Sequence, residues 1–385
     1  MTTRRLLSIA HSYSVGLNRR LAHEMARVGA GRWEVTAAAP NFLQGDLRPI
    51  PLVVEPDEPC RVVGVPARWT KRVHIMLYSR RLRQLLKDEP WDLVHCWEEP
   101  YILAGGQVAR WTPQQTPLVY YTCQNIAKRY PPPFSMIERR SLERCSAWIA
   151  MGQTVAEAQI GRGVGYERRA HRVITPGVDL NHFRPRPEGR VKVCQILGWS
   201  DPGPPVVGYL GRFVPEKGID LIMRSLDAID SPWRALFVGT GPMEGALRLW
   251  AERHDGRVKV ATDVRHDQVS NFLNAMDLLA APSQTKEAWR EQFGRMLIEA
   301  FACGVPVVAS DSGEIPHVVA NAGLIVGEHD DDGWRETLAA LIDSPERRAE
   351  LRARGLDRVR AEFAWPVIAR RHLDFFEELL DANVR

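Results

Sequence analysis

Short apolar runs recur along the chain and are separated by stretches with the spacing of amphipathic helices. In the first half, the apolar runs lie at 5–10, 33–39, 91–96, 118–122, 147–151 and 173–179. Runs of this length without polar alternation are typical of parallel strands covered on both faces. From about Gly16, apolar residues return every three to four positions, which predicts a helix between the first two strands. The opening of the chain is therefore a βαβ unit.

The second half repeats this alternation. Apolar runs lie at 206–211, 234–238, 258–261, 278–281, 305–310 and 324–326. Helical spacing predicts helices at 219–228 and 268–276, from about 294, and at 365–382. Both halves therefore predict an α/β fold with a parallel, doubly wound sheet.

Length and proline distribution suggest where the domains divide. The chain has 385 residues, enough for two domains. Prolines cluster between 184 and 205, which favours a connection there. We predict a first domain over 1–180, a linker over 181–205 and a second domain over 206–364, followed by a terminal helix over 365–385.

Charge is distributed unevenly between the halves. Residues 1–180 carry 25 Lys and Arg against 16 Asp and Glu, whereas residues 181–385 carry 26 against 31. Residues 71–88 are predicted to form a basic amphipathic helix. Such a helix can lie on an anionic membrane surface, but it is more often a solvated surface helix, and both interpretations stay open.

Composition excludes several classes of protein. No apolar run reaches the ~20 residues that a membrane-spanning helix needs. The six cysteines show neither CxxC nor zinc-ligand spacing. We therefore expect free thiols and a cytoplasmic location, with peripheral contact at the inner membrane face as an option. No nucleic-acid partner and no metal site are expected.

The stretch 283–311 carries the clearest candidate chemistry. It predicts a loop, a helix beginning near Gly294, a stop at Gly304 and a buried strand. The unpaired N–H groups at a helix start attract phosphate. Glu291 and Glu299 flank that start, and carboxylates beside a phosphate suit sugar or ribose hydroxyls. The alternative is an amphipathic helix with two solvated glutamates.

Other candidates follow strand ends, where ligands bind in doubly wound sheets. Arg212 and Lys217 follow the strand at 206–211 and could clamp a diphosphate. In the first half, residues 14–16, 95–99 and 123–125 should share one rim.

Two further motifs favour plainer interpretations. Gly239-Thr240-Gly241 suggests a dinucleotide site, but Glu244 occupies the position of the third glycine. The run Asp330–Asp332 could ligate Mg²⁺, and more simply caps a helix.

Four motifs in the second half resemble the retaining glycosyltransferases of family 4, which have the GT-B fold. They are VITPGVDLNHFRP, GYLGRFVPEKGID, APS…EQFGRMLIEAFACGVPVVAS and FAW…ARRHLDFFEELL. The resemblance implies two Rossmann-like doubly wound domains facing a central cleft, with the acceptor bound by the first domain and the donor by the second. It also implies that the last helix returns to the first domain.

The resemblance implies site residues by position. Arg212 and Lys217 would bind the donor diphosphate, Glu299 the ribose, and Glu291 the donor-sugar hydroxyls. The remaining donor contacts would come from Gly16, Val264, Gln292, Phe293, Gly294 and Arg295.

The chain departs from the family pattern on the first-half rim. Only Gly16 stands in the first glycine loop. Cys123-Gln124-Asn125 stands where many members have a histidine, so Gln124, Asn125 or His95 would substitute for it. Gly313-Glu314 replaces a Gly-Gly pair, and His317 replaces a glutamate.

The implied reaction is retaining sugar transfer by a front-face, metal-independent route. The donor is a nucleotide-diphosphate sugar, UDP- or GDP-linked in preference, which acts as a co-substrate, so no cofactor is expected. The acceptor is a hydroxyl of a glycan, a lipid-linked sugar or a small molecule. A GT-B sugar-nucleotide epimerase, a dehydrogenase and a non-catalytic nucleotide-sugar-binding protein stay open as alternatives.

Overall fold

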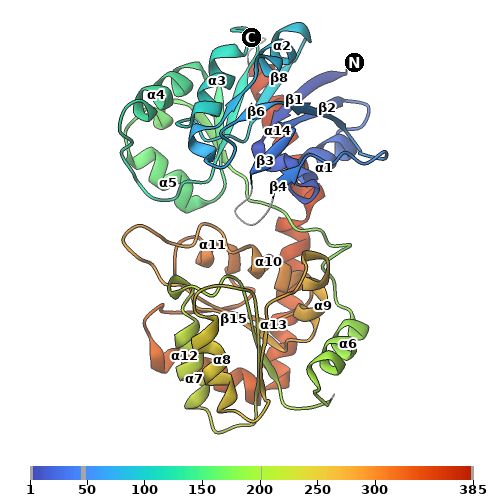
Figure 1. Cartoon of the computed structure of the whole chain (residues 1–385), viewed down its shortest axis with the longest axis vertical. Helices are drawn as coiled ribbons and strands as arrows, with labels where there is room; N and C mark the ends of the chain where they lie inside the picture. The colour runs from blue at the N-terminus through green and yellow to red at the C-terminus, as the bar shows by residue number, and fades with distance from the viewer. Residues whose placement is uncertain (1–2, 45–48, 201, 383–385) are drawn as a thin grey trace. The chain divides into compact units, whose positions relative to one another are not determined.

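The structure is a computed structural model that describes residues 3–44, 49–200 and 202–382. The chain divides into two compact units, one comprising Met1–Pro176 with Trp365–Arg385 and the other Gly177–Ala364 (Figure 1). The 181–205 stretch, predicted as a linker, lies wholly within the second unit.

The first unit is built around a seven-stranded sheet in the order β11-β10-β9-β8-β1-β2-β5. Its strands are β1 (Arg4–Ile9), β2 (Trp33–Pro40), β5 (Arg61–Val65), β8 (Leu93–Cys96), β9 (Leu118–Thr122), β10 (Ala147–Ala150) and β11 (Ala170–Val173). Short hairpin strands are β3 (Phe42–Gln44), β4 (Pro49–Pro51), β6 (Ala67–Arg68) and β7 (Leu77–Tyr78). Every pairing in the large sheet is parallel, and the strand order reverses between β1 and β8.

The helices of this unit are α1 (Arg20–Val28), α2 (Arg80–Asp88), α3 (Leu103–Trp111), α4 (Phe134–Arg144), α5 (Gln153–Gly161) and α14 (Trp365–Ala382). Short helical turns are η1 (His11–Ser14), η2 (Gly16–Arg19), η3 (Val73–Ile75) and η4 (Tyr166–Arg168). Helix α5 was not predicted, and the last strand is 170–173, not 173–179.

The basic helix predicted over 71–88 is wrong in extent. Only α2 is α-helical there, because η3 and the strand β7 precede it. Its apolar side chains Leu82, Leu85 and Leu86 are buried within the unit. An apolar face already packed against protein is not available for insertion into a lipid surface.

Helix α14 belongs to the first unit although it is the last helix of the chain (Figure 1). Glu377 accepts hydrogen bonds from Arg32 and from the Trp33 indole, each at 2.9 Å. Its buried face includes His372 and Phe376, which contact strand residues of the sheet. The last helix is therefore part of the first unit's core.

The second unit holds a six-stranded parallel sheet in the order β14-β13-β12-β15-β16-β17. Its strands are β12 (Val206–Leu210), β13 (Arg234–Val238), β14 (Val258–Ala261), β15 (Leu278–Ala281), β16 (Val307–Ser310) and β17 (Leu324–Val326). Its α-helices are α6 (Pro187–Leu197), α7 (Ile219–Asp227), α8 (Glu244–Glu252), α9 (Val269–Asn274), α10 (Arg295–Ala302), α11 (Ile315–Val319), α12 (Asp331–Asp343) and α13 (Pro345–Arg358). Shorter turns are η5 (Pro215–Lys217), η6 (His266–Gln268) and the π-helical η7 (Val359–Phe363).

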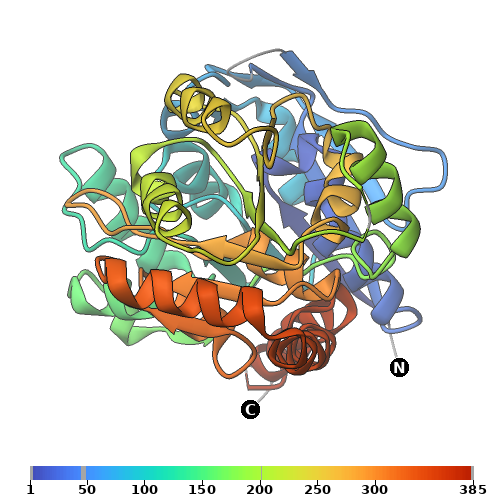
Figure 2. The same cartoon turned by 90° about the horizontal axis from the view of Figure 1, so that it is seen from below.

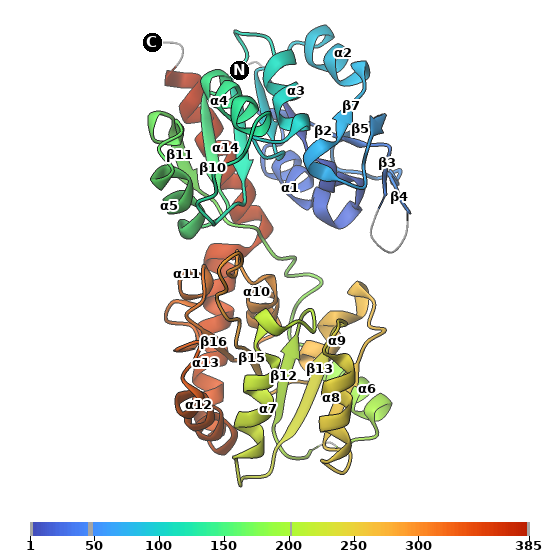
Figure 3. The same cartoon turned by 60° about the vertical axis from the view of Figure 1, so that its left-hand side comes forward.

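Helices cover both faces of this sheet, as Figures 2 and 3 show. Leucine, isoleucine and tryptophan side chains of α7, α8 and α12 form one core with β12, β13 and β15. The strand order reverses between β12 and β15, which makes their carboxyl ends the expected ligand site of the sheet.

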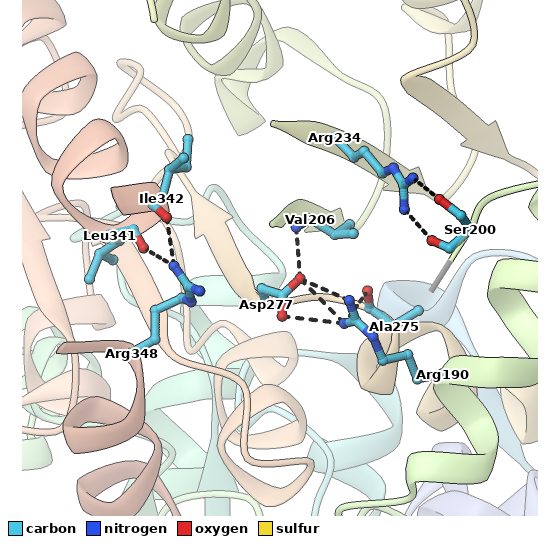
Figure 4. A network of polar contacts seen from close by, with 9 residues as sticks. All are labelled: Arg190, Ser200, Val206, Arg234, Ala275, Asp277, Leu341, Ile342 and Arg348. Atoms are coloured by element: carbon cyan, nitrogen blue, oxygen red, sulfur yellow. Dashed lines mark hydrogen bonds and ion pairs between the residues drawn. The ribbon is translucent and has the colours of Figure 1, made fainter. Parts of the chain in front are cut away.

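Helix α6 explains why the proline-rich stretch is not a free linker. Arg190 of α6 lies 3.3 Å from the Asp277 carboxylate, which also accepts the backbone N–H of Val206 at 2.8 Å (Figure 4). Arg186 N donates to the Asn274 side chain of α9 at 2.6 Å. The proline-rich stretch therefore contains a helix that polar contacts fix to the second unit.

Candidate active site

The strand-order reversal of the second unit brings two loops together, one after β12 and one after β15. The β12 loop carries Lys217 at the end of η5, and the β15 loop carries Glu291. The Lys217 ammonium contacts Glu291 Oε2, and both side chains are almost completely buried. Residues 74 positions apart in sequence thus form one ion pair at the carboxyl edge of the sheet.

Further contacts fix this pair. The buried Ser283 hydroxyl donates to Glu291 Oε2 at 3.0 Å, and the Lys217 ammonium lies 5.1 Å from the centre of the Trp289 ring. Backbone hydrogen bonds between Lys286 and Trp289 close the turn that carries the indole. Neither Ser283 nor Trp289 was predicted as a site residue, because only the folded loops bring them to Lys217 and Glu291.

Two glycines allow neighbouring backbone segments to pack closely around this ion pair. Gly218 has φ +66°, and a Cβ there would lie 2.0 Å from the Pro282 carbonyl oxygen. Gly313 has φ +57°, and its Cβ would lie 2.1 Å from the Glu291 carbonyl oxygen. Glu314 donates its N–H to that same carbonyl at 3.1 Å from an ordinary right-handed conformation, φ −81°. Only the first position of the Gly313-Glu314 pair therefore requires glycine.

Helix α10 begins beside Glu291, as predicted. Its N-cap is Gly294 with φ +77°, a left-handed conformation that favours glycine. Gly304 just beyond the helix has φ +72°, which confirms the predicted stop. Phe293 is buried and its ring packs edge-on against Phe363 at 6.0 Å.

Glu299 in the second turn of α10 is a second unusual carboxylate. The side chain is on the buried face of the helix, and burial raises the pKa of its carboxyl to about 7, although Arg295 opposes the shift. Among the described residues, no hydrogen-bond donor pairs with this carboxylate. A buried acceptor of this kind is suited to the hydroxyl groups of a ligand.

The remaining predicted donor-binding residues of the second unit are exposed or only half-buried. Arg212 lies in the β12 loop, but its guanidinium is exposed and lies 3.9 Å from Glu216. Val264 is half-buried in the loop after β14, while Gln292 and Arg295 are exposed. The structure thus brings Lys217, Glu291 and the α10 start together and leaves Arg212 facing solvent.

His95 corrects a prediction for the first unit. It was placed on the rim as a substitute histidine, but its side chain is completely buried inside strand β8. Ser8 Oγ lies 3.0 Å from Nδ1, and the His372 ring of α14 lies 5.6 Å away. Burial holds the pKa of His95 well below its usual range. We therefore assign His95 to the core and not to catalysis.

Gly16 and Asn125 do lie beyond strand ends of the first sheet. Gly16 opens η2 after β1, and Asn125 is buried in the loop after β9. The Gly16 loop is held by the buried Arg19, which donates to Tyr13 O at 2.6 Å and to Glu58 at 2.5 Å.

Three other features singled out in the sequence have clear structural outcomes. The Asp330 carboxylate accepts the Gly333 N–H at 2.9 Å, so the aspartate run caps α12 as expected. Within residues 3–44, 49–200 and 202–382, no helix is both long and apolar enough to cross a membrane. All six cysteines are free thiols, five of them buried.

The second-unit edge combines a held ammonium, a helix start and two buried carboxylates, a combination that suits a phosphorylated, hydroxyl-rich ligand. The chain resembles solved structures titled sucrose-phosphate synthase from Thermosynechococcus elongatus (TM-score 0.73, 22% identity, 98% of this chain and 100% of that one) and Anabaena HepE in complex with UDP and glucose (TM-score 0.73, 20% identity, 97% and 100%). At such identity the likeness shows the fold, which is GT-B with two Rossmann-like doubly wound domains.

Sequence comparisons give the family. The model described as glycosyltransferase family 4 matches residues 17–182, and the one described as glycosyl transferases group 1 matches residues 199–358. A D-inositol 3-phosphate glycosyltransferase of Nocardia farcinica is 30% identical over 338 residues, which is 78% of this chain and 69% of the relative. The chain belongs to the group 1 glycosyltransferases of family 4.

Another relative is more similar over a shorter span. A GDP-mannose-dependent monoacylated alpha-(1-6)-phosphatidylinositol monomannoside mannosyltransferase of Corynebacterium glutamicum is 35% identical over 202 residues, covering 51% of this chain and 53% of the relative. The chain thus spans about half the length of this relative.

Proposed function

We propose that the protein transfers a sugar from a nucleotide-diphosphate donor to a hydroxyl acceptor with retention of anomeric configuration. The observation that carries the proposal is the Lys217–Glu291 pair beside the start of α10, with Glu299 buried one turn further. An ammonium and a helix start suit a diphosphate, and the two carboxylates suit the hydroxyl groups on either side of it.

Each residue then has a role. Lys217 and the free N–H groups of α10 stabilise the negative charge that develops on the leaving diphosphate. Arg212 adds a second cation when its exposed side chain turns toward the phosphates. Glu299 accepts hydrogen bonds from the ribose, and Glu291 holds donor-sugar hydroxyls while it positions Lys217.

The contacts of Glu291 favour a front-face route. A retaining mechanism with an enzyme nucleophile needs a free carboxylate against the anomeric carbon. One Glu291 oxygen already contacts the Lys217 ammonium and the Ser283 hydroxyl. The acceptor proton then passes to the leaving diphosphate oxygen, and the two cationic groups replace a metal.

Similar proteins narrow the substrates. The Corynebacterium relative is named for GDP-mannose, and the Anabaena structure holds UDP and glucose. We propose a GDP- or UDP-linked hexose as donor. The inositol phosphate in the name of the Nocardia relative makes an inositol or inositol-linked glycan the first acceptor to test.

A thermal-shift screen with UDP, GDP, ADP, dTDP and their sugars tests the proposal. We expect one nucleotide series to raise Tm, and Lys217→Ala and Glu299→Ala each to reduce its affinity at least tenfold. Transfer should persist in EDTA. Unchanged nucleotide affinity in both variants would refute the site, and loss of activity in EDTA that Mg²⁺ restores would refute the metal-free route.

A further inference from the structure

A histidine of the first unit is fixed to a buried carboxylate where the strand order reverses between β1 and β8. His11 follows β1, and Glu98 follows β8. The His11 backbone N–H donates to Glu98 Oε1 at 2.6 Å, and His11 Nδ1 lies 2.7 Å from Glu98 Oε2. Both carboxylate oxygens therefore bind one residue, which fixes the imidazole as well as its backbone.

One partner of the His11–Glu98 pair is buried and the other is partly exposed. Glu98 is completely buried, and the Tyr78 hydroxyl donates to its Oε1 at 2.7 Å. The His11 side chain is 29% exposed. Among the described residues, Nε2 of His11 has no hydrogen-bond partner. The outward nitrogen is thus the free end of a carboxylate–histidine pair.

The charged neighbours of His11 favour its protonated form. Burial lowers the pKa of the imidazole, but Glu98, through charge and a hydrogen bond, and Glu99, through charge, outweigh that effect and raise it above its ordinary value. A protonated ring with Nδ1–H bound to Glu98 presents Nε2–H as an outward donor.

Glu99, the residue after Glu98, supplies a second carboxylate, and its charge acts on the His11 ring. Glu99 is a half-buried residue, and its carboxylate accepts hydrogen bonds from Thr122 Oγ1 at 2.6 Å and from Cys123 N at 2.7 Å. In the sequence, Trp97 stands between the end of β8 and the two glutamates. It is half-buried, and its ring centre lies 4.3 Å from that of Tyr121. Two carboxylates whose charges act on one imidazole disfavour the binding of an anion, whereas hydroxyl groups both donate and accept hydrogen bonds.

We propose that His11 and Glu99 form a subsite for the hydroxyl groups of a neutral sugar or polyol, with Glu98 as the positioning residue. The assignment rests on the proposed glycosyl transfer, in which this ligand is the accepting moiety. His11 Nε2–H donates to one hydroxyl oxygen and Glu99 accepts from another.

Binding and transfer measurements test the subsite. Isothermal titration with myo-inositol and with methyl α-mannoside should show affinity for the wild type and at least a tenfold loss in His11→Ala. The KM for the acceptor should rise by a similar factor, while the Kd for the nucleotide stays unchanged. His171→Ala on the edge strand β11 is the matched control and should behave as the wild type.

The pH dependence separates positioning from a general structural role. The KM for the acceptor should rise as pH passes above the pKa of His11, when Nε2 changes from donor to acceptor. Glu98→Gln should move this rise to lower pH, because the carboxylate that favours the protonated ring is gone. His11→Gln keeps a donor that does not titrate and should abolish the rise.

Several outcomes would overturn the assignment. They are no polyol binding by the wild type, unchanged acceptor affinity in His11→Ala, or a wild-type pH profile in His11→Gln or Glu98→Gln. Should His11→Ala lose its fold, the His11→Gln profile decides. Lost nucleotide binding in Lys217→Ala with normal acceptor affinity in His11→Ala would refute this subsite alone and leave the proposed function intact.

Discussion

Gly313→Ala should impair the proposed donor site through the backbone of Glu291. The residue has φ +57°, and an added Cβ would lie 2.1 Å from the Glu291 carbonyl oxygen. A left-handed conformation costs an alanine about 1–2 kcal/mol. Relief of the overlap also requires the two segments to separate by about 1 Å. A displacement of that size at a positioned group costs about a hundredfold in rate.

Gly198→Ala is the matched control. Gly198 ends α6 with φ +68°, and nothing lies within 4 Å of the position of its Cβ. The backbone strain is therefore similar in the two variants, and only Gly313→Ala displaces Glu291. We expect Gly198→Ala to lower Tm slightly and to retain wild-type transfer.

The assay compares kcat/KM for transfer, the Kd for the nucleotide and Tm in the two variants. We expect kcat/KM to fall about a hundredfold in Gly313→Ala and to stay within twofold of the wild type in Gly198→Ala. Equal activity losses in the two variants would show that strain alone is responsible. A fully active Gly313→Ala would show that the position of Glu291 is not critical.

Three further predictions concern buried charges. Because the pKa of Glu299 is raised to about 7, its ionisation opposes folding. Between pH 4.5 and 8 the free energy of unfolding of the wild type should therefore fall by ~2–3 kcal/mol relative to that of Glu299→Gln. The same pH dependence of stability in both proteins would contradict this. Burial lowers the pKa of His372 to about 4, so acidification from pH 7 to 5 should destabilise the wild type by up to ~2 kcal/mol more than His372→Leu, as measured by urea unfolding. Trp289→Ala should weaken nucleotide binding roughly twofold to thirtyfold by removing the ring beside Lys217, and unchanged calorimetric affinity would exclude the contact.

Much of the fold follows from local pattern. Apolar runs located most strands of both sheets, because a doubly wound strand is buried on both faces whatever its neighbours are. The exceptions are β5, for which no run was singled out, and β11, which was predicted at 173–179. The start of α10 at Gly294 and its stop at Gly304 were readable from glycine and the helical period. Within the proline-rich stretch α6 was missed, because its place depends on a contact with Asp277, 87 residues away from Arg190.

The candidate site could be predicted only in part from the sequence. Local motifs gave Lys217, Glu291 and Glu299 as candidates, but not the ion pair between Lys217 and Glu291. Strand order decided that pair, because the reversal between β12 and β15 is what places Lys217 on Glu291. The rule that ligands bind at the carboxyl ends of strands gave a wrong prediction for His95. This residue lies near a strand end in the sequence, but the last helix, α14, covers it.

The sequence by itself therefore determined most of the strands, the α/β class of both halves and the residue types of the proposed donor site, because these depend on periodicity and backbone preference over short windows. Tertiary structure decided which side chains meet. His11 and Glu98 stand 87 residues apart, and no local spacing connects them. They form a pair because parallel crossovers place β1 beside β8, and the carboxyl ends of adjacent parallel strands share one edge.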